Sequence, residues 1–227
     1  MWRAKKGSTC RAFLADAMQV LRAADHKRMA WKNGGGETVE IIVSPPQASM
    51  DSFDWRISMA TIMQDGAFSS FAGVDRTLTV LSGDGIELTM ADRPVVILSP
   101  ASSPYAFPAD VGCSARLLGS TVSDLNVMTA RDSLTHQVRP IDGPTRQAVA
   151  PGSVVVVVST GVTRLATPDH QVELGHLDAV VFEGVAEADF IEIAPEGRGF
   201  LILIDRLHPD RHVTPHPELQ SGPGAQP

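Results

Sequence analysis

The feature that most constrains the fold of this chain is a regular alternation of short apolar runs with glycine-containing turns. The clearest example runs from Thr77 to Met90, where Thr-Leu-Thr-Val-Leu and Ile-Glu-Leu-Thr-Met flank Ser-Gly-Asp-Gly. Alternation places Leu78 and Val80 on one face of the first arm, and glycine permits the positive φ angles of a tight loop. The segment therefore predicts an antiparallel hairpin.

Comparable runs continue along the chain and predict further strands. They cover residues 39–43, 54–60, 94–98, 115–118, 153–159, 162–167, 171–174, 179–182, 188–193 and 199–204. Short strands at this spacing are typical of an all-β sandwich or barrel. Because the second half repeats the rhythm of the first, we expect an all-β fold with two tandem small β-barrels in one compact chain.

The ends of the chain and a polar segment near residues 140–151 suggest the domain limits. We expect an N-terminal extension over residues 1–19, a first barrel with the ligand pocket over 20–140, a second barrel over 141–206, and a disordered Pro/Gly-rich tail over 207–227. Met18 is an alternative start, which would place residues 1–17 outside the native protein. Apolar residues at helical spacing predict a short amphipathic helix within residues 9–24.

Charge and cysteine usage exclude several classes of protein. The formal net charge is −7, and no basic face or motif indicates direct binding to nucleic acid. The longest apolar run, 154–158, is far shorter than the roughly 20 residues of a membrane span. Cys10 and Cys113 are widely separated, which favours a reducing compartment and a cytoplasmic protein. A homodimer is left open.

Two stretches carry polar side chains that an inward-facing strand would bury. In Phe-Asp-Trp-Arg-Ile-Ser (53–58), alternation separates Trp55 and Ile57 from Arg56 and Ser58. If the second face lines a barrel, Arg56 is suited to hold a ligand carboxylate through two parallel hydrogen bonds. The alternatives are an internal salt bridge, for instance to Asp75, or an exposed arginine.

A second polar pair and a glycine run complete the candidate pocket. Asp124 and Asn126 share one strand face in Asp-Leu-Asn-Val-Met (124–128). Trp-Lys-Asn-Gly-Gly-Gly (31–36) is either a loop that presents amide groups to an anion or a strand entry where the chain rounds a barrel corner. These two interpretations of the glycine run remain open.

Histidine positions argue against a metal centre. Residues 31–130 contain no histidine, His170 and His176 are expected at the surface, and His208, His212 and His216 fall among prolines that exclude a shared helix. We therefore predict no metal and no cofactor.

Four motifs in order give the chain a specific resemblance. Trp-Lys-Asn-Gly-Gly-Gly (31–36), Phe-Asp-Trp-Arg-Ile-Ser (53–58), Asp-Gly-x-Phe-Ser-x-Phe-x-Gly-Val-Asp-Arg-Thr-Leu (65–78) and Asp-Leu-Asn-Val-Met-Thr (124–129) resemble the HutD/Ves family over roughly residues 20–206. The resemblance implies a double cupin, that is an all-β bicupin of two jelly-roll-like barrels, and nominates five lining residues, namely Asn33, Gly34, Arg56, Ser58 and Asn126. Val39 stands where the family often has an arginine, which bears on the choice of ligand.

The resemblance also implies a function. HutD proteins are associated with histidine utilisation, where they are thought to bind urocanate or formylglutamate and to moderate the pathway. We therefore expect a small-carboxylate-binding regulator that is not an enzyme. The alternative is a cupin isomerase or oxygenase, metal-dependent or metal-free, in which a residue such as Asp75 would act as acid or base.

Overall fold

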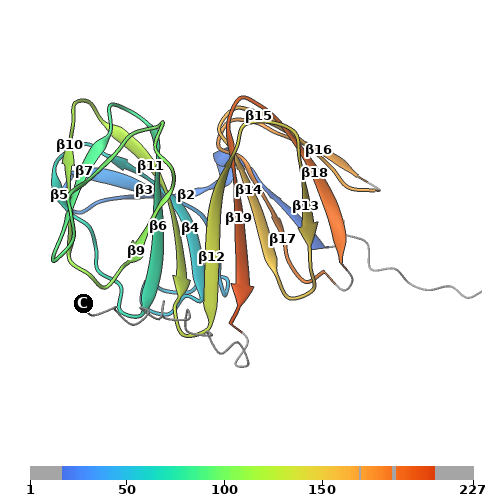
Figure 1. The fold of residues 1–227 in the computed structure, drawn as a ribbon, viewed down its shortest axis with the longest axis horizontal. Coiled ribbons are helices and arrows are strands. Elements are labelled where there is room, and N and C mark those ends of the chain that lie inside the picture. The colour runs from blue at the N-terminus through green and yellow to red at the C-terminus, as the bar shows by residue number, and fades with distance from the viewer. Residues whose placement is uncertain (1–16, 169, 186–187, 208–227) are drawn as a thin grey trace, which may run out of the picture.

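The computed structural model describes residues 17–168, 170–185 and 188–207, and within them it confirms the all-β prediction. Every regular element there is a strand, apart from the single 3-10 turn η2 (Ala23–Asp25). The strands form four antiparallel sheets that close into two barrels lying side by side (Figure 1). Among the described residues, no helix is both long and apolar enough to cross a membrane.

The first barrel closes a six-stranded sheet against a four-stranded one. The larger sheet runs in the order β2 (Lys27–Ala30), β3 (Gly36–Ser44), β4 (Trp55–Ile62), β11 (Val122–Ala130), β6 (Val74–Ser82) and β9 (Tyr105–Pro108). The smaller sheet runs in the order β5 (Gly66–Ala67), β10 (Cys113–Leu117), β7 (Ile86–Met90) and β8 (Val96–Leu98).

The second barrel repeats this plan with five and four strands. Its larger sheet runs in the order β1 (Met18–Leu21), β17 (Ala179–Phe182), β14 (Val154–Ser159), β19 (Gly199–Arg206) and β12 (Leu134–Ile141). Its smaller sheet runs in the order β13 (Thr145–Val149), β18 (Asp189–Glu196), β15 (Val162–Ala166) and β16 (Gln171–Leu174). The chain thus enters this barrel first through β1 and again from β12 onward.

The strands of the predicted hairpin between Thr77 and Met90 exist, but their predicted pairing is wrong. β6 pairs with β11 and β9, whereas β7 pairs with β10 and β8, so the intervening turn carries the chain from one sheet to the other. Leu78 on β6 and Ile86 on β7 belong to the same apolar cluster inside the first barrel. Two successive strands show the same alternation whether they pair with each other or lie in two facing sheets. The local sequence pattern therefore could not predict which strands pair.

The two larger sheets pack face to face and form a central core shared by both barrels. Trp55, Ile57 and Met59 of β4 enter this core from the first barrel. From the second barrel, β14 contributes Val154, Val156 and Val158, while its other two valines face the interior of the second barrel. Burial on both faces explains why β14 is an uninterrupted apolar run rather than an alternating one.

One polar connection crosses this central core. His136 of β12 has its Nδ1 2.7 Å from Thr129 Oγ1 and its Nε2 2.8 Å from Thr77 Oγ1. Both threonines belong to the first barrel and are buried. Burial lowers the pKa of His136 from its usual 6.5 to about 4, so the ring is neutral at pH 7.

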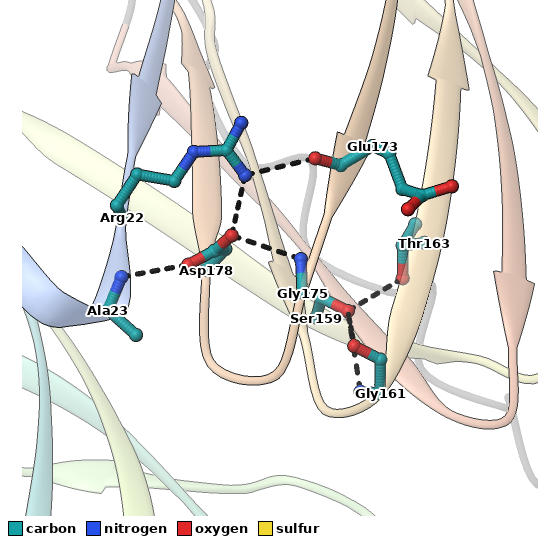
Figure 2. Close-up of polar contacts among 8 residues, drawn as sticks. All are labelled: Arg22, Ala23, Ser159, Gly161, Thr163, Glu173, Gly175 and Asp178. Carbon is teal, nitrogen blue, oxygen red and sulfur yellow. Dashed lines mark hydrogen bonds and ion pairs between the residues drawn. The ribbon is translucent and has the colours of Figure 1, made fainter.

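The helix predicted within residues 9–24 is wrong in its described part, because Met18–Leu21 is the edge strand β1. The chain that follows β1 is fastened to the second barrel by Asp178 (Figure 2). Asp178 Oδ2 lies 2.6 Å from Arg22 Nη1 and accepts from the Gly175 amide at 3.0 Å, while Oδ1 accepts from the Ala23 amide at 2.8 Å. The carboxylate therefore fixes the point where the chain passes from one barrel to the other.

Candidate functional site

A cavity of about 310 Å³ lies in the first barrel against the inward faces of β4, β6 and β11. Strand alternation explains the polarity of the cavity. Every second residue of β4 faces the central core, and the residues between them point into the cavity. These are Arg56, Ser58 and Ala60, and they are joined by Asn126 from the adjacent β11 and by Arg76 from β6, the next strand of the sheet. The aromatic rings of Trp31, Phe68 and Phe71 and the side chains of Met50 and Met128 complete much of the wall.

Arg56 is buried in this wall with a mixed set of partners. Its side chain is 3% exposed. Its Nε donates to Glu40 Oε2 at 2.8 Å and its Nη1 to Ser58 Oγ at 3.1 Å, while Nη2 is buried without a hydrogen-bond partner among the described residues. The predicted alternative of an internal salt bridge is confirmed, but the partner is Glu40 and not Asp75, which pairs with Arg131 at 2.7 Å.

A second arginine shares the cavity. Arg76 is 4% exposed, and its Nε donates to Asn126 Oδ1 at 2.8 Å, with a further hydrogen bond from Nη2 to the same oxygen. Its guanidinium carbon lies 4.4 Å from the ring centroid of Phe68. The amide and the aromatic face stabilise the buried cation.

Asp124 supplies a negative charge behind this arginine. Asn126 Nδ2 donates to Asp124 Oδ1, so Arg76, Asn126 and Asp124 form one chain of hydrogen bonds. Asp124 is 0% exposed, and burial raises its pKa to about 6 although Arg76 acts in the opposite direction. Burial also disfavours the charged form of Arg76 and so lowers its pKa, whereas the attraction of Asp124 acts to raise it.

The structure brings four of the five predicted residues together. Asn33, Arg56, Ser58 and Asn126 all line the cavity. Gly34 lies beside them in the turn between β2 and β3 but is not among the lining residues.

The glycine run has structural reasons of its own. Gly34 adopts φ +72°, which favours glycine, and a Cβ on Gly36 would lie 2.3 Å from the carbonyl oxygen of Thr61. The run therefore lets β3 start close against β4. It also holds Asn33 at the cavity, with Asn33 Oδ1 accepting from the Gly35 amide at 3.0 Å.

Sequence reasoning missed Arg76 and Glu40, the two charged residues nearest to the candidate clamp. Arg76, Leu78 and Val80 are spaced two residues apart on β6, so their side chains lie on the same face of the strand. Because Leu78 and Val80 face the barrel interior, Arg76 does so too. Glu40 has no such signal, because an irregularity between Glu40 and Ile42 shifts the register of β3 against β4.

The polar side chains around this cavity are not those that usually hold a transition metal. The lining residues of the cavity include no histidine, cysteine or carboxylate, and the described residues form no cluster of three such side chains. His170 and His176 are exposed, and the three C-terminal histidines lie outside the described residues. The wall offers mainly hydrogen-bond donors, which suit an anion better than a cation.

Asp75, the acid or base of the enzymatic alternative, does not line this cavity. It points away from Arg76, its neighbour on β6, and pairs with Arg131. The structure therefore removes the one residue that the sequence offered for that role at this site.

A larger hollow of about 680 Å³ lies over the outer sheet of the second barrel. Its charged residues are open to solvent: Arg164 is 59% and Glu173 61% exposed, and the two form a salt bridge. Exposed pairs of this kind contribute little to ligand affinity. The smaller cavity, with two buried guanidinium groups, is the better candidate site.

Known proteins resemble this chain along most of its length. The HutD family model matches residues 23–201. An uncharacterised 21.2 kDa protein from the hutC 3′ region of Pseudomonas putida is 36% identical over 191 residues, which is 83% of this chain and 98% of the relative. Protein Ves of Citrobacter koseri is 39% identical over 130 residues, 57% of this chain and 66% of Ves.

Solved structures agree with these relatives. HutD from Pseudomonas fluorescens SBW25, in a formate condition, has a TM-score of 0.74 and 33% identity over 85% of this chain and all of that one. A cupin 2 conserved barrel domain protein from Leptotrichia buccalis shares the fold alone, with a TM-score of 0.51 and 12% identity over 80% of this chain and 96% of that one. This chain therefore belongs to the HutD family, as its four motifs predicted.

Proposed function

We propose that this HutD protein binds a small carboxylate in the first-barrel cavity and acts as a regulator of histidine utilisation rather than as an enzyme, with urocanate or formylglutamate as ligand. The observation that carries the proposal is the incomplete coordination of Arg56. Two of its three guanidinium nitrogens have protein partners, and the third is buried without one in the part of the chain that the structure describes. A buried donor without a partner carries a free-energy cost that a ligand oxygen would remove.

The charge of the cavity favours an anion for the same reason. Arg56 lies close enough to Arg76 to disfavour its charge. Glu40 and Asp124 offset this repulsion, but neither is among the residues lining the cavity. A carboxylate placed between the two guanidinium groups would interact favourably with both, and we expect about 1.5–3 kcal/mol from its hydrogen bonds to Arg56.

The rest of the wall suits a small organic acid. A volume of about 310 Å³ lies at the lower end of ordinary ligand cavities. Trp31 and Phe68 offer apolar faces, and Asn33 adds a polar group to the wall. The position of the P. putida relative in the hutC region supports a link to histidine utilisation.

Thermal unfolding of the purified protein with urocanate, formylglutamate, glutamate and formate tests the proposal. Ligand binding to the folded state alone adds RT ln(1 + [L]/Kd) to the free energy of unfolding, about 2.7 kcal/mol at [L] = 100 Kd. We expect a selective rise in Tm with one of these acids. In Arg56→Met the Kd for that acid should increase roughly ten- to 150-fold.

Two controls separate binding from folding. Arg56→Met leaves Glu40 without its partner, so the double variant with Glu40→Gln removes both charges and should lose binding equally. Arg116→Met removes an exposed arginine of the outer sheet, paired with Glu87, and should leave Kd unchanged. The proposal is wrong if no acid stabilises the parent, or if the parent and Arg56→Met bind the acid with equal Kd.

A further inference from the structure

The chain of hydrogen bonds behind the cavity suggests how the site accommodates an incoming anion. In the structure, Asp124 is the carboxylate that faces Arg76 through the amide of Asn126. It lies between β4 and β6, opposite Ala60 and Val80, and neither neighbour carries a charge. Its negative charge is favoured first by the cation of Arg76, and in addition by the amide of Asn126 and the backbone of Ala60.

The charged and titratable groups around this arrangement come from four other strands. Arg76 belongs to β6, Arg56 to β4, Glu40 to β3, and the thiol of Cys113 on β10 lies near enough to Arg76 to influence it. Burial raises the pKa of that thiol, so it stays neutral at pH 7. Asp124 and Glu40 are thus the two negative charges facing the two guanidinium groups.

We propose that Asp124 is the internal counter-ion of Arg76, and that a ligand carboxylate which takes over this role binds together with one proton captured by Asp124. The inference rests on the proposed carboxylate site. Once an anion lies between Arg56 and Arg76, three carboxylates, those of the ligand, Asp124 and Glu40, face two guanidinium groups. Like charges at such short range raise the affinity of one carboxylate for a proton.

The unpaired oxygen of Asp124 makes proton capture feasible. Oδ1 accepts from Asn126, but Oδ2 is buried and has no hydrogen-bond partner among the described residues. A proton on Oδ2 would therefore displace no existing donor and leave the Asn126 contact intact. The free carboxyl already has a pKa of about 6, so a modest further rise protonates it at pH 7.

Asp124 is a positioning residue in this scheme, because it acts on the ligand through Asn126 and Arg76. It also sets a limit on ligand charge. Because Asp124 takes up a proton when an anion binds, we expect the highest affinity for a ligand that places a single carboxylate at Arg76. A second acidic group of the same ligand would have to lie elsewhere, toward the exposed Lys32 at the wall.

Direct titration of Asp124 tests the inference. The protein is labelled with ¹³C at aspartate carboxyl carbons, and the Asp124 signal is followed from pH 5.5 to 8.5, free and with saturating formate or formylglutamate. Neither probe has a group that titrates in this range. We expect the apparent pKa of Asp124 to rise by at least about one unit on binding, which linkage converts into a Kd about fivefold higher at pH 8.5 than at pH 6.

Asp124→Asn should remove this pH dependence while keeping the contact to Asn126. Its Kd is expected to vary less than about twofold over the same range, whereas Glu192→Gln, an exposed carboxylate of the second barrel, should behave as the parent. If Asp124→Asn fails to fold, the titration of the parent, assigned through backbone correlations, decides alone.

The outcomes distinguish this inference from the proposed function. If an acid binds but the Asp124 titration does not move, the proton-coupled scheme is overturned and the carboxylate site stands. If neither probe binds the parent at any pH, the carboxylate site itself is refuted, and the scheme that rests on it falls too.

Discussion

Acidification is expected to destabilise the protein through His136, the residue that connects the two larger sheets. In the unfolded chain this histidine titrates near 6.5, whereas in the fold burial holds its pKa at about 4. Between these two values the unfolded state binds more protons than the folded state, so the free energy of unfolding decreases as pH falls from 6.5 toward 4. Above pH 6.5 the contribution is fully present.

The size of the effect follows from the two pKa values. A difference from 6.5 to about 4 corresponds to a loss of about 2 kcal/mol at pH 5 and about 3 kcal/mol at pH 4, relative to pH 7.5. Hydrogen bonding does not cause the shift, because Thr77 and Thr129 hydroxyls can rotate to accept from a protonated ring. The cost is that of placing a charge between two apolar sheets.

Urea unfolding of the parent and of His136→Gln at pH 7.5, 6 and 5 measures this contribution. The variant is needed because Asp124 acts in the opposite direction: its pKa is raised in the fold, so its protonation stabilises the protein as pH falls through about 6. The difference between parent and variant cancels that term. We expect the parent to lose about 2 kcal/mol more than His136→Gln between pH 7.5 and 5. Parallel stability curves over this range would refute the reasoning.

Three further substitutions test the packing described above. Ile57→Ala removes a side chain that is 0% exposed in the central core, and urea unfolding should show a loss of about 2–5 kcal/mol; a loss below 1 kcal/mol would mean that the two sheets are not tightly packed. Asp178→Ala leaves the amides of Ala23 and Gly175 without their acceptor, so hydrogen exchange at residues 18–25 should accelerate relative to the rest of the second barrel, and uniform exchange rates would contradict the anchoring role. Gly36→Ala forces a Cβ against the Thr61 carbonyl and should lower Tm, whereas a Tm equal to that of the parent would remove the close-approach argument.

The sequence predicted strand positions and strand faces better than strand partners. Alternation on β4 correctly separates Arg56 and Ser58 from Trp55 and Ile57, because one face of that strand meets the cavity and the other the central core. The apolar run at residues 153–159 was likewise predicted as a strand, and β14 lies there. These inferences succeed because they depend only on the two-residue period of a strand.

Pairing and ion-pair partners depend on contacts between distant segments and could not be predicted in the same way. The turn after β6 looks like a hairpin loop, yet it joins two sheets, and β1 lacks any local sign that it pairs with β17 some 160 residues later. The partner of Arg56 was missed for a related reason. Glu40 reaches it across an irregular stretch of β3, whereas the partner suggested from the sequence, Asp75, lies on the face of β6 opposite Arg76 and pairs with Arg131.

The shared central core makes each barrel depend on the other, so that the two can be exchanged between relatives only together. Within the described residues, the apolar outer face of each larger sheet is covered by the other sheet, and the chain crosses between the barrels after β1 and before β12. Residues 20–140 produced alone would expose the buried faces of Ile57 and Val127 and should aggregate. A chimera between HutD relatives should therefore exchange both larger sheets together, because a barrel taken from one parent would meet a surface shaped for another.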